Sequence, residues 1–201
     1  MGITENILPA KINRRCALRG LMGAAASLAA PYAVQADQNA SLATLAAARG
    51  VRFGSAVSLK GLAQPDYREL IDRECAIVVC ENEMKWLFLR PTAKAFDFTK
   101  ADKIVSFAQS AGKRVRGHTL LFHQGLNRAW DDLCAQNGAE PTLTGHIATT
   151  IAHYKHAVHS WDVVNEPIDP KSARSDRLRN SSFLKSMGEK YLDIAFHAAR
   201  D

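Results

Sequence analysis

A carboxylic acid and an amide stand side by side where a short, mainly apolar segment ends. Asn165 and Glu166 directly follow Trp161–Val164, and Pro167 comes next. A short apolar run that stops at a proline predicts a buried strand ending at this pair. An α/β barrel keeps its chemistry at the carboxyl ends of its strands. There a Glu can protonate a glycosidic oxygen while an Asn holds a hydroxyl of the same sugar. The alternative is a buried strand that ends in an ordinary polar turn.

Polar side chains also accompany the apolar runs at 76–80 and 115–122. Parallel strands of a barrel end at one face, so we expect these side chains to converge with the Asn165–Glu166 pair in one cleft. Such a mixture of charged, amide, imidazole and indole groups suits a sugar polymer, which offers hydroxyls for hydrogen bonds and ring faces for stacking. The side chains concerned are Glu81, Asn82, Lys85, Trp86, His118 and His123.

The segments that must position these groups alternate between strand and helix patterns. We expect strands at 53–57, 76–80, 115–122 and 161–165, and helices at 65–75, 99–111, 144–158 and 183–198. Thr99 and Asp102 fit a capping box that opens the second of these helices. Four strand-helix units in succession predict a parallel α/β sheet. An open doubly wound sheet also accommodates four units, but Phe53–Ala56 lacks the Gly-rich phosphate loop of a nucleotide fold.

The first 36 residues read as an export signal. Asn13-Arg14-Arg15 is a twin-arginine pattern that leads into the small, apolar stretch Leu18–Ala30, and Val34-Gln35-Ala36 presents small residues to a signal peptidase. We expect cleavage after Ala36 and a bacterial protein that is periplasmic or secreted. A buried helix or a membrane anchor is the alternative, but an anchor needs about 20 apolar residues. The general secretory route is the alternative to twin-arginine export.

Composition and charge exclude several classes of protein. The chain has 201 residues, 47% hydrophobic and 23% charged, which is ordinary globular composition. Its net charge is +6, and residues 1–36 hold four basic residues against one acidic residue, so residues 37–201 carry about +3. No basic stripe with interleaved aromatic residues is present, which argues against nucleic-acid binding. We likewise expect no membrane association after signal cleavage.

The cysteines and a group of histidines do not predict further sites. Three cysteines remain after signal cleavage, so at most one disulfide can form, and Cys75 and Cys80 fit a buried helix-to-strand segment as small apolar residues. Histidines spaced three residues apart do not share one tight helical face, and no carboxylate lies among them. We therefore expect a helix surface there and no metal site. These histidines are His153, His156 and His159, and the third cysteine is Cys134.

Three motifs resemble those of glycoside hydrolase family 10, the retaining endo-1,4-β-xylanases, in order and in rough spacing. The resemblance covers about residues 50–201 and implies a (β/α)8 barrel, of which residues 37–201 would form about the first four units. It also implies hydrolysis of internal β-1,4 bonds in xylan and xylo-oligosaccharides with net retention, and no cofactor. The motifs are Glu81-Asn82-Glu83-Met84-Lys85-Trp86, Arg116-Gly117-His118-Thr119-Leu120 and Trp161-Asp162-Val163-Val164-Asn165-Glu166-Pro167.

The resemblance assigns a role to each matching residue. Glu166 would be the general acid/base. Asn165 would bind the 2-hydroxyl of the sugar in the cleavage subsite, and His118 would contact hydroxyls of that sugar. A core histidine is the alternative for His118. The next xylose on the glycone side would be bound by Glu81, Asn82 and Lys85. The alternative for Glu81 and Lys85 is an ion pair on a solvated turn. Trp86 and His123 would support the cleft and Phe122 would form an apolar wall, and Trp86 and Phe122 are counted among the substrate-binding residues.

The sequence also departs from the family pattern. Phe122 stands where the family usually has Trp, Leu87 where Asp is common, and residues 124–130 differ from the usual Ser-Gln-Leu-Pro stretch. These departures concern fine substrate preference. A retaining glycosidase also needs a nucleophilic carboxylate, which the family carries near the end of its seventh strand. Asp169, Asp176 and Glu189 are poor replacements, because none is expected at a second strand end that faces Glu166.

These observations lead us to expect that the 201 residues alone are catalytically inactive. The chain would then correspond to the N-terminal half of a xylanase barrel, shorter than the roughly 250 residues of a complete one. One alternative is a non-catalytic xylan-binding protein that keeps the glycone subsites, and another is a gene fragment without function. A further alternative is an open-sheet domain that binds a small ligand at a site unrelated to Glu166.

Overall fold

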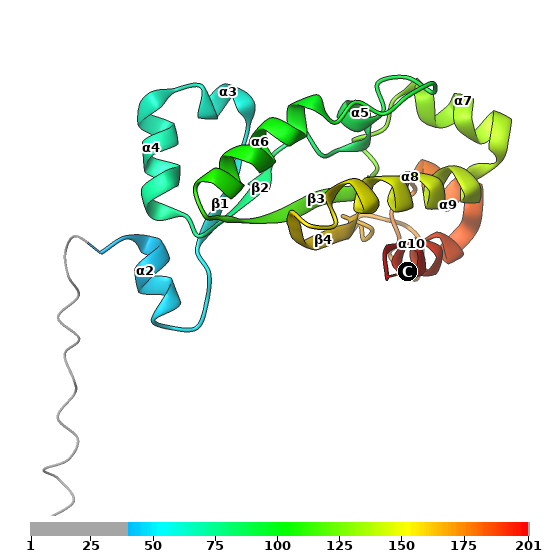
Figure 1. Ribbon diagram of the computed structural model, residues 1–201. Coiled ribbons are helices and arrows are strands. Elements are labelled where there is room, and N and C mark those ends of the chain that lie inside the picture. Colours follow the sequence, from blue (N-terminus) through cyan, green and yellow to red (C-terminus); the bar gives the residue numbers. More distant parts are fainter. Residues whose placement is uncertain (1–39, 201) are drawn as a thin grey trace, which may run out of the picture. The chain divides into compact units, whose positions relative to one another are not determined.

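A four-stranded parallel sheet forms the centre of the computed structural model, which describes residues 40–200 (Figure 1). The predicted signal peptide, residues 1–36, lies outside the described residues. The strands pair in chain order, β1-β2-β3-β4, and every neighbouring pair is parallel. This order confirms the predicted parallel α/β fold, and it is the order of the first strands of a (β/α)8 barrel. The strands are β1 (Gly54–Val57), β2 (Ile77–Cys80), β3 (Arg114–Phe122) and β4 (Val158–Asn165).

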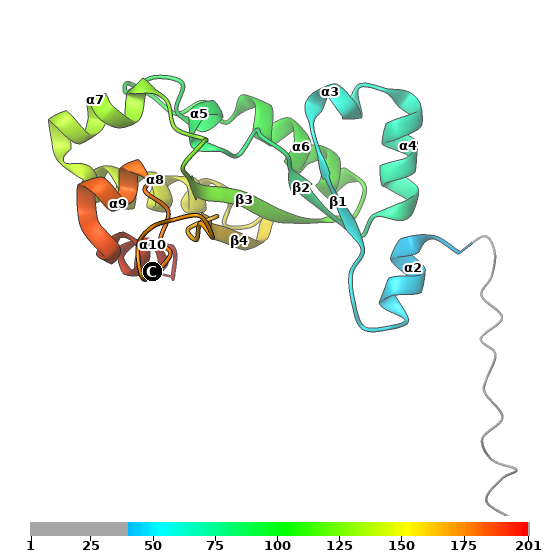
Figure 2. The same cartoon turned by 180° about the vertical axis from the view of Figure 1, so that it is seen from behind.

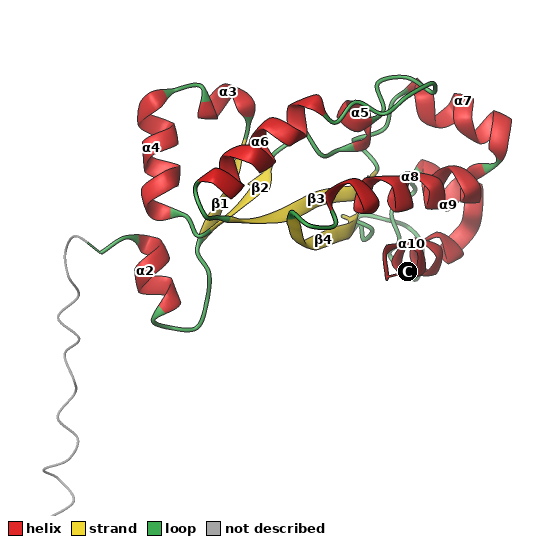
Figure 3. Cartoon of the chain, viewed as in Figure 1, coloured by secondary structure: helices red, strands yellow, loops and turns green. Residues whose placement is uncertain are grey.

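Helices connect the strands (Figure 3). The principal ones are α4 (Pro65–Glu74), α6 (Thr99–Ser110), α8 (Ala139–Tyr154) and α10 (Tyr191–Arg200). Shorter elements are α2 (Leu42–Ala47), α3 (Leu59–Leu62), α5 (Trp86–Leu89), α7 (Arg128–Asn137), α9 (Ser182–Met187) and the 3-10 helix η1 (Gly188–Lys190). Within residues 40–200, no helix combines the length and the apolar composition that crossing a bilayer requires.

The two faces of the sheet have different surroundings. Val57, Val78 and Val115 are fully buried and share one apolar cluster with residues of α4 and α6. Ala56 and Arg116 point to the opposite face and are exposed. Figure 1 shows α6 and α8 along the first face, and Figure 2 shows β1, β2 and β3 with no helix of the described chain in front of them. The open face is the one that would line the interior of a closed barrel.

Helix α6 begins at Thr99, as predicted, but its first turn is capped differently. Its apolar face is buried as expected at Ile104, but the capping box is wrong. The Thr99 N–H donates to Asp97 Oδ1 at 2.9 Å, so the capping carboxylate lies two residues before Thr99. Asp102 instead pairs with His153 Nε2 at 2.9 Å. A carboxylate on either side of a helix start can satisfy its free N–H groups, and the nearer one prevails here.

Three boundaries near the predicted site also required correction. Helix α8 starts at Ala139, five residues before the expected Thr144, and Val158 belongs to β4 rather than to this helix. Helix α7 was not predicted. The last predicted helix is divided at Gly188, whose φ of 65° ends α9. Of the three spaced histidines, only the first lies on a helix; the second lies in a turn and the third in β4. Cys75 and Cys80 are buried, as expected.

Candidate active site

The carboxyl ends of β2, β3 and β4 bring the predicted site residues together in two groups. In the first, Glu81 and His118 line one hollow on the open face, and Arg116 belongs to the same lining. In the second, Asn165 and Glu166 line a smaller hollow with His123. The register places Phe122 directly beside Asn165, so the ends of β3 and β4 adjoin. The strand ends are neighbours, but the side chains line two separate hollows and not the single cleft that the sequence predicts.

Asp162 ties β3 to β4 within the first group. Its Oδ1 accepts a 2.9 Å hydrogen bond from Arg116 Nε, and its Oδ2 lies 2.9 Å from His118 Nδ1. The Thr119 hydroxyl donates to the Asp162 carbonyl at 2.7 Å, and the His118–Thr119 peptide bond is cis. His118 is therefore held by a carboxylate on the neighbouring strand and is not an isolated core histidine. With Nδ1 engaged, Nε2 is the ring atom left to meet a ligand.

The pKa of Asp162 reflects this position. Burial acts to raise the pKa, but hydrogen bonds from Arg116 and His118 outweigh it, and the pKa lies below the ordinary value of an Asp. We did not single out Asp162 or Arg116 from the sequence. Both belong to the quoted motifs, and the pairing of Arg116, His118 and Asp162 on one sheet face follows once the register of β3 and β4 is known.

The turn after β2 presents Asn82 and Lys85. Lys85 Nζ donates to Asn82 Oδ1 at 2.9 Å and lies 5.3 Å from the centroid of the Phe122 ring. The Lys85 ammonium group thus binds the Asn82 side-chain amide and does not form the alternative ion pair with Glu81. Glu83, also not singled out from the sequence, is buried and accepts hydrogen bonds from the Leu59 and Asn82 N–H groups at 3.0 and 3.2 Å. Its carboxylate fixes the shape of the turn.

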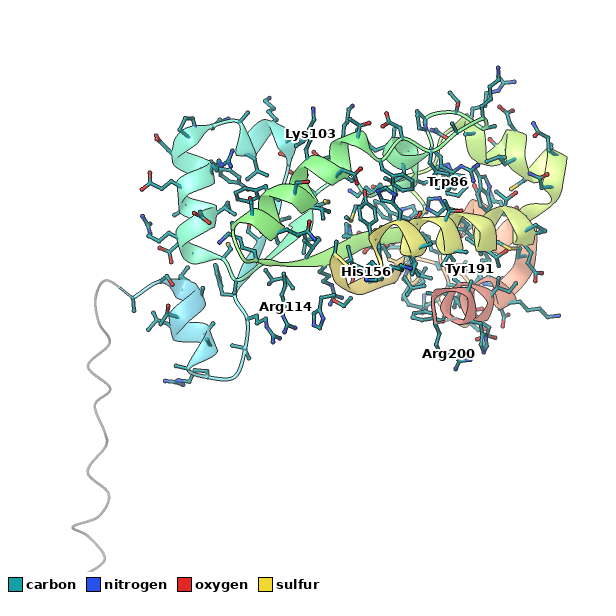
Figure 4. The ribbon with its side chains drawn as sticks, viewed as in Figure 1. Trp86, Lys103, Arg114, His156, Tyr191 and Arg200 are labelled. Atoms are coloured by element: carbon teal, nitrogen blue, oxygen red, sulfur yellow. The ribbon has the colours of Figure 1, made fainter. Side chains whose placement is uncertain are left out.

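Trp86 directly follows this turn and is packed in the protein interior. Only 2% of Trp86 is exposed, its ring centroid lies 4.2 Å from that of His146 in α8, and Trp130 meets it edge-on at 5.4 Å. Figure 4 shows Trp86 between α5 and α8, far from Arg114 at the amino end of β3. The Trp86 ring can therefore support the turn, but it has no free face for a sugar to stack on, in contrast to the expected indole in the cleft. Burial and the nearby Arg90 lower the pKa of His146 to about 3, so the stacked ring is neutral.

Glu166 begins the loop that follows β4. Its φ is 52°, a left-handed conformation that residues other than glycine seldom adopt, and its side chain is 52% exposed. The neighbouring His123 is half-buried and its Nδ1 has no hydrogen-bond partner among the described residues. Burial lowers the pKa of His123, the positive charge of Arg179 lowers it further, and the carboxylates of Glu166 and Asp169 act in the opposite direction.

Other carboxylates after β4 are bound to arginines. Asp169 lies 3.4 Å from Arg179 Nη1, and Asp176 receives two hydrogen bonds from Arg174, which lower the pKa of Asp176 to about 2. Glu189 lies 3.3 Å from the same Arg174. All three follow β4 in loops or in η1, and none is at the end of another strand. Their positions agree with the expectation that they do not oppose Glu166.

A parallel βα sheet with Asn165 and Glu166 at the end of β4, a Lys–Asn pair after β2 and His118 within β3 has the features of a barrel-type glycoside hydrolase. The sequence profile of glycosyl hydrolase family 10 matches residues 41–201. The chain belongs to this family.

Individual relatives agree with this assignment. Endo-1,4-beta-xylanase 3 of Hypocrea jecorina is 34% identical over 149 residues, covering 74% of this chain and 42% of the relative. Xylanase 10B from Thermotoga petrophila RKU-1, solved in complex with xylobiose, superposes with a TM-score of 0.70 at 32% identity, covering 81% of this chain and 50% of that one. CbXyn10B in native form gives a TM-score of 0.72 at 28% identity, covering 80% and 49%. The chain therefore spans about half the length of these relatives.

Proposed function

We propose that the chain provides the acid/base carboxylate and the glycone-side sugar subsites of an endo-1,4-β-xylanase. The observation that carries this proposal is Glu166 at the carboxyl end of β4, directly after Asn165, which pairs with Phe122 at the end of β3. His118 lies further back on β3, where it pairs with Asp162. The family membership supports the reaction class. Xylan and xylo-oligosaccharides are the proposed substrates, hydrolysed at internal β-1,4 bonds with net retention and without a cofactor.

In the proposed reaction Glu166 acts twice. It first protonates the oxygen of the leaving sugar and then removes a proton from the water that releases the bound glycosyl group. Its exposed side chain is accessible to both partners. Asn165 holds the 2-hydroxyl of the sugar at the cleavage point, where such a hydrogen bond strengthens toward the transition state. His118, oriented by Asp162, donates or accepts through Nε2 at the same sugar.

The glycone-side subsite is proposed at the turn after β2. Lys85 and Asn82 already share a hydrogen bond, so their remaining donors are fixed in direction before a sugar arrives. Glu81 is exposed beside them and adds an acceptor for hydroxyl groups. Trp86 and Glu83 keep the turn in shape from below, and Phe122 forms an apolar wall in place of an indole, with no N–H to donate.

The second carboxylate of the retaining mechanism must lie about 5–5.5 Å from the first. We propose that neither Asp169, Asp176 nor Glu189 serves, because arginines occupy their oxygens. The 201 residues by themselves should then bind xylo-oligosaccharides without hydrolysing them. A catalytically inactive xylan-binding remnant is the second candidate function, and the exposed Glu81–Asn82–Lys85 turn favours it equally until hydrolysis is measured.

Binding separates a sugar site from an inert fragment. Calorimetric titration of the chain with xylohexaose should show saturable binding, and Asn82→Ala should weaken it at least tenfold because both the amide and the fixed Lys85 are lost. Asn137→Ala, an exposed site at the end of α7, is the matched control and should leave binding unchanged. No binding by the unmodified, folded chain would contradict the proposed subsites.

Hydrolysis separates the enzyme from the binding remnant. Reducing ends released from xylan should be absent for the chain alone and for Glu166→Gln. Activity that Glu166→Gln abolishes would show that a second carboxylate exists in the chain or in another copy of it. Activity restored by adding a separately produced C-terminal half of a family barrel would assign the acid/base role to Glu166 if the same substitution removed it.

We also propose that residues 1–36 form a twin-arginine signal peptide and residues 37–201 the family domain. Replacing Arg14 and Arg15 by lysine should retain the precursor inside the cell, and the N-terminus of the exported protein should be Asp37. Export that is unaffected by the double substitution would favour the general secretory route.

A further inference from the structure

The guanidinium of Arg179 lies against the loop that carries Glu166. Its Nε donates to the Glu166 carbonyl at 2.9 Å and its Nη2 to the Ile168 carbonyl at 3.2 Å. The Arg179 backbone N–H donates to the Pro167 carbonyl at 2.8 Å. Arg179 therefore donates hydrogen bonds to the carbonyl groups of three consecutive residues, 166–168. The Arg179 side chain is 24% exposed, and its two bonds to these carbonyls lie at the exposed surface of the loop.

Those bonds act on an unusual stretch of backbone. Glu166 has a φ of 52°, where the Cβ crowds the main chain, and Pro167 has no N–H with which to continue the ladder. A conformation of this kind persists only where the surroundings hold it. The planar fork of an arginine fits two carbonyls in fixed directions, which a lysine cannot reproduce. The hold on the Glu166 main chain also fixes where its side chain leaves the strand end.

The same guanidinium is shared between two carboxylates. Nη1 lies 3.4 Å from Asp169 Oδ2, and Nη2 lies 3.9 Å from Glu166 Oε2. His123 directly follows β3 and lines the same hollow as Arg179 and Glu166. The charges of Arg179, Glu166 and Asp169 all act on the pKa of His123. In the described chain, the ionisable groups around Glu166 are Arg179, Asp169 and His123, and the buried Tyr191 lines the same hollow. Arg179 is the one permanent positive charge among them.

We propose that Arg179 is the positioning residue of Glu166: its fork holds the left-handed backbone, and its charge, divided with Asp169, holds the carboxylate at the strand end. This rests on the proposed acid/base role of Glu166. Asp169 limits the attraction, because it engages one arm of the guanidinium and so prevents a tight two-armed pair with Glu166. A tight pair would leave the carboxyl oxygens unable to transfer a proton.

His123 reports on this arrangement without any need for activity. We would follow the imidazole Cε1–H signals of the whole chain by NMR as a function of pH, with His123→Gln to assign the signal. Arg179→Gln should raise the pKa of His123 by roughly 0.5 pH unit or more, because a nearby positive charge is lost. Asp169→Asn should lower the pKa of His123, because an opposing negative charge is lost. Arg179→Lys keeps the charge, so the pKa of His123 should stay near that of the unmodified chain.

The fork is tested by amide exchange at Asp169, whose N–H donates to the Arg177 main-chain carbonyl at 2.9 Å. Both Arg179→Lys and Arg179→Gln should speed exchange there at least tenfold, since neither side chain spans the two carbonyls. Arg177→Gln is the matched control: it removes the same charge two residues away, but Arg177 bonds to the Ser172 and Pro170 carbonyls and not to Glu166. It should leave both the His123 titration and the exchange rates unchanged.

Each outcome decides one question. An unchanged His123 titration in Arg179→Gln, or equal effects of Arg179→Gln and Arg177→Gln, would overturn the charge part of the proposal. Unchanged amide exchange in Arg179→Lys would overturn the fork. If Arg179→Gln does not fold, Arg179→Lys and Asp169→Asn still decide both parts. Failure of xylohexaose binding with all these NMR results as expected would count against the proposed function and not against the role of Arg179.

Discussion

Asp162 is the residue on which the pairing of β3 and β4 at the site depends. Asp162→Asn removes the charge that Arg116 and His118 share, and should lower the free energy of unfolding by about 2 kcal/mol, as for other hydrogen bonds to charged groups. The pKa of Asp162 is below its ordinary value in the folded chain, so the stabilisation is present above the ordinary Asp pKa and is lost as pH falls through the lowered pKa. Thermal unfolding of both proteins between pH 7 and pH 2 should therefore show a gap that closes in acid.

The control for this prediction is Asp102→Asn. Asp102 also pairs with a histidine at 2.9 Å, but on the exposed surface, where an ion pair contributes little. A loss of stability as large as that of Asp162→Asn, or a gap for Asp162→Asn that stays constant down to pH 2, would show that the charge of Asp162 is not what stabilises the pairing.

At the residue scale the sequence indicates which groups meet a ligand better than it indicates what holds them. Glu166, Asn165 and His118 are predictable because they occur in motifs at strand ends. Asp162 and Arg179 are not predictable in this way. Asp162 acts through His118, 44 residues away in the sequence. Arg179 acts on Glu166 only because of the path that the intervening loop takes. Positions of this kind need the register and the loop conformation, neither of which is encoded locally.

At the scale of elements, Gly117 determines how closely β3 and β4 fit together. A Cβ at Gly117 would lie 2.1 Å from Cε3 of the Trp161 ring, so Gly117→Ala must displace the indole. Overpacking of this kind should lower the free energy of unfolding by about 1–3 kcal/mol, measured by urea denaturation. Gly145→Ala in α8 is the control, because nothing lies within 4 Å of its added carbon. Alanine should stabilise that helix by up to about 1 kcal/mol. Equal stability of the two variants would contradict the close packing.

Helix α8 carries a second prediction through His146. The pKa of His146 is about 3 in the folded chain because of burial, whereas an unfolded histidine takes up a proton near its ordinary pKa of about 6.5. The unfolded state therefore binds more protons between these values, and stability should fall as pH drops from about 6.5 toward 3. His146→Phe keeps a ring against Trp86 and should flatten this part of the stability curve. His156→Phe, at an exposed turn, should keep the slope. An unchanged slope in His146→Phe would contradict the assignment.

The elements themselves were predictable to different degrees. Strand positions were recovered within a few residues because short, mainly apolar runs such as Ile77–Cys80 and Trp161–Val164 leave little alternative, although β4 begins three residues before its predicted start. Helix starts were recovered at Pro65 for α4 and at Thr99 for α6, but not for α8. Pro141 and Gly138 suggest a loop, yet a proline in the first turn is compatible with a helix, and Gly138 takes the positive φ of 85° that separates α7 from α8. Gly138 and Pro141 can therefore indicate either a loop or the start of a new helix, and the sequence alone does not distinguish the two.

At the scale of the whole molecule, a parallel sheet normally has both faces covered. Among the described residues, β1 and β4 are unpaired at their outer edges and one face of the sheet lacks a helix layer. Open edges and exposed apolar groups favour association between molecules. We expect the chain to self-associate as its concentration rises, which analytical ultracentrifugation measures directly. The same exposure explains why charged groups such as Arg116 tolerate their position on this face.

The last prediction uses two neighbouring valines that point to opposite faces of β2. Val79 is half-buried on the open face, and Val78 is fully buried beneath α4 and α6. Val79→Lys places a charge where another molecule would pack, so it should reduce self-association by at least tenfold while the melting temperature stays nearly unchanged. Val78→Lys buries an unpaired charge and should unfold the chain. If Val79→Lys unfolds the chain as Val78→Lys does, both faces of the sheet are covered in solution. If Val79→Lys folds but associates as before, the contact lies elsewhere, and the open face is not what drives the molecules together.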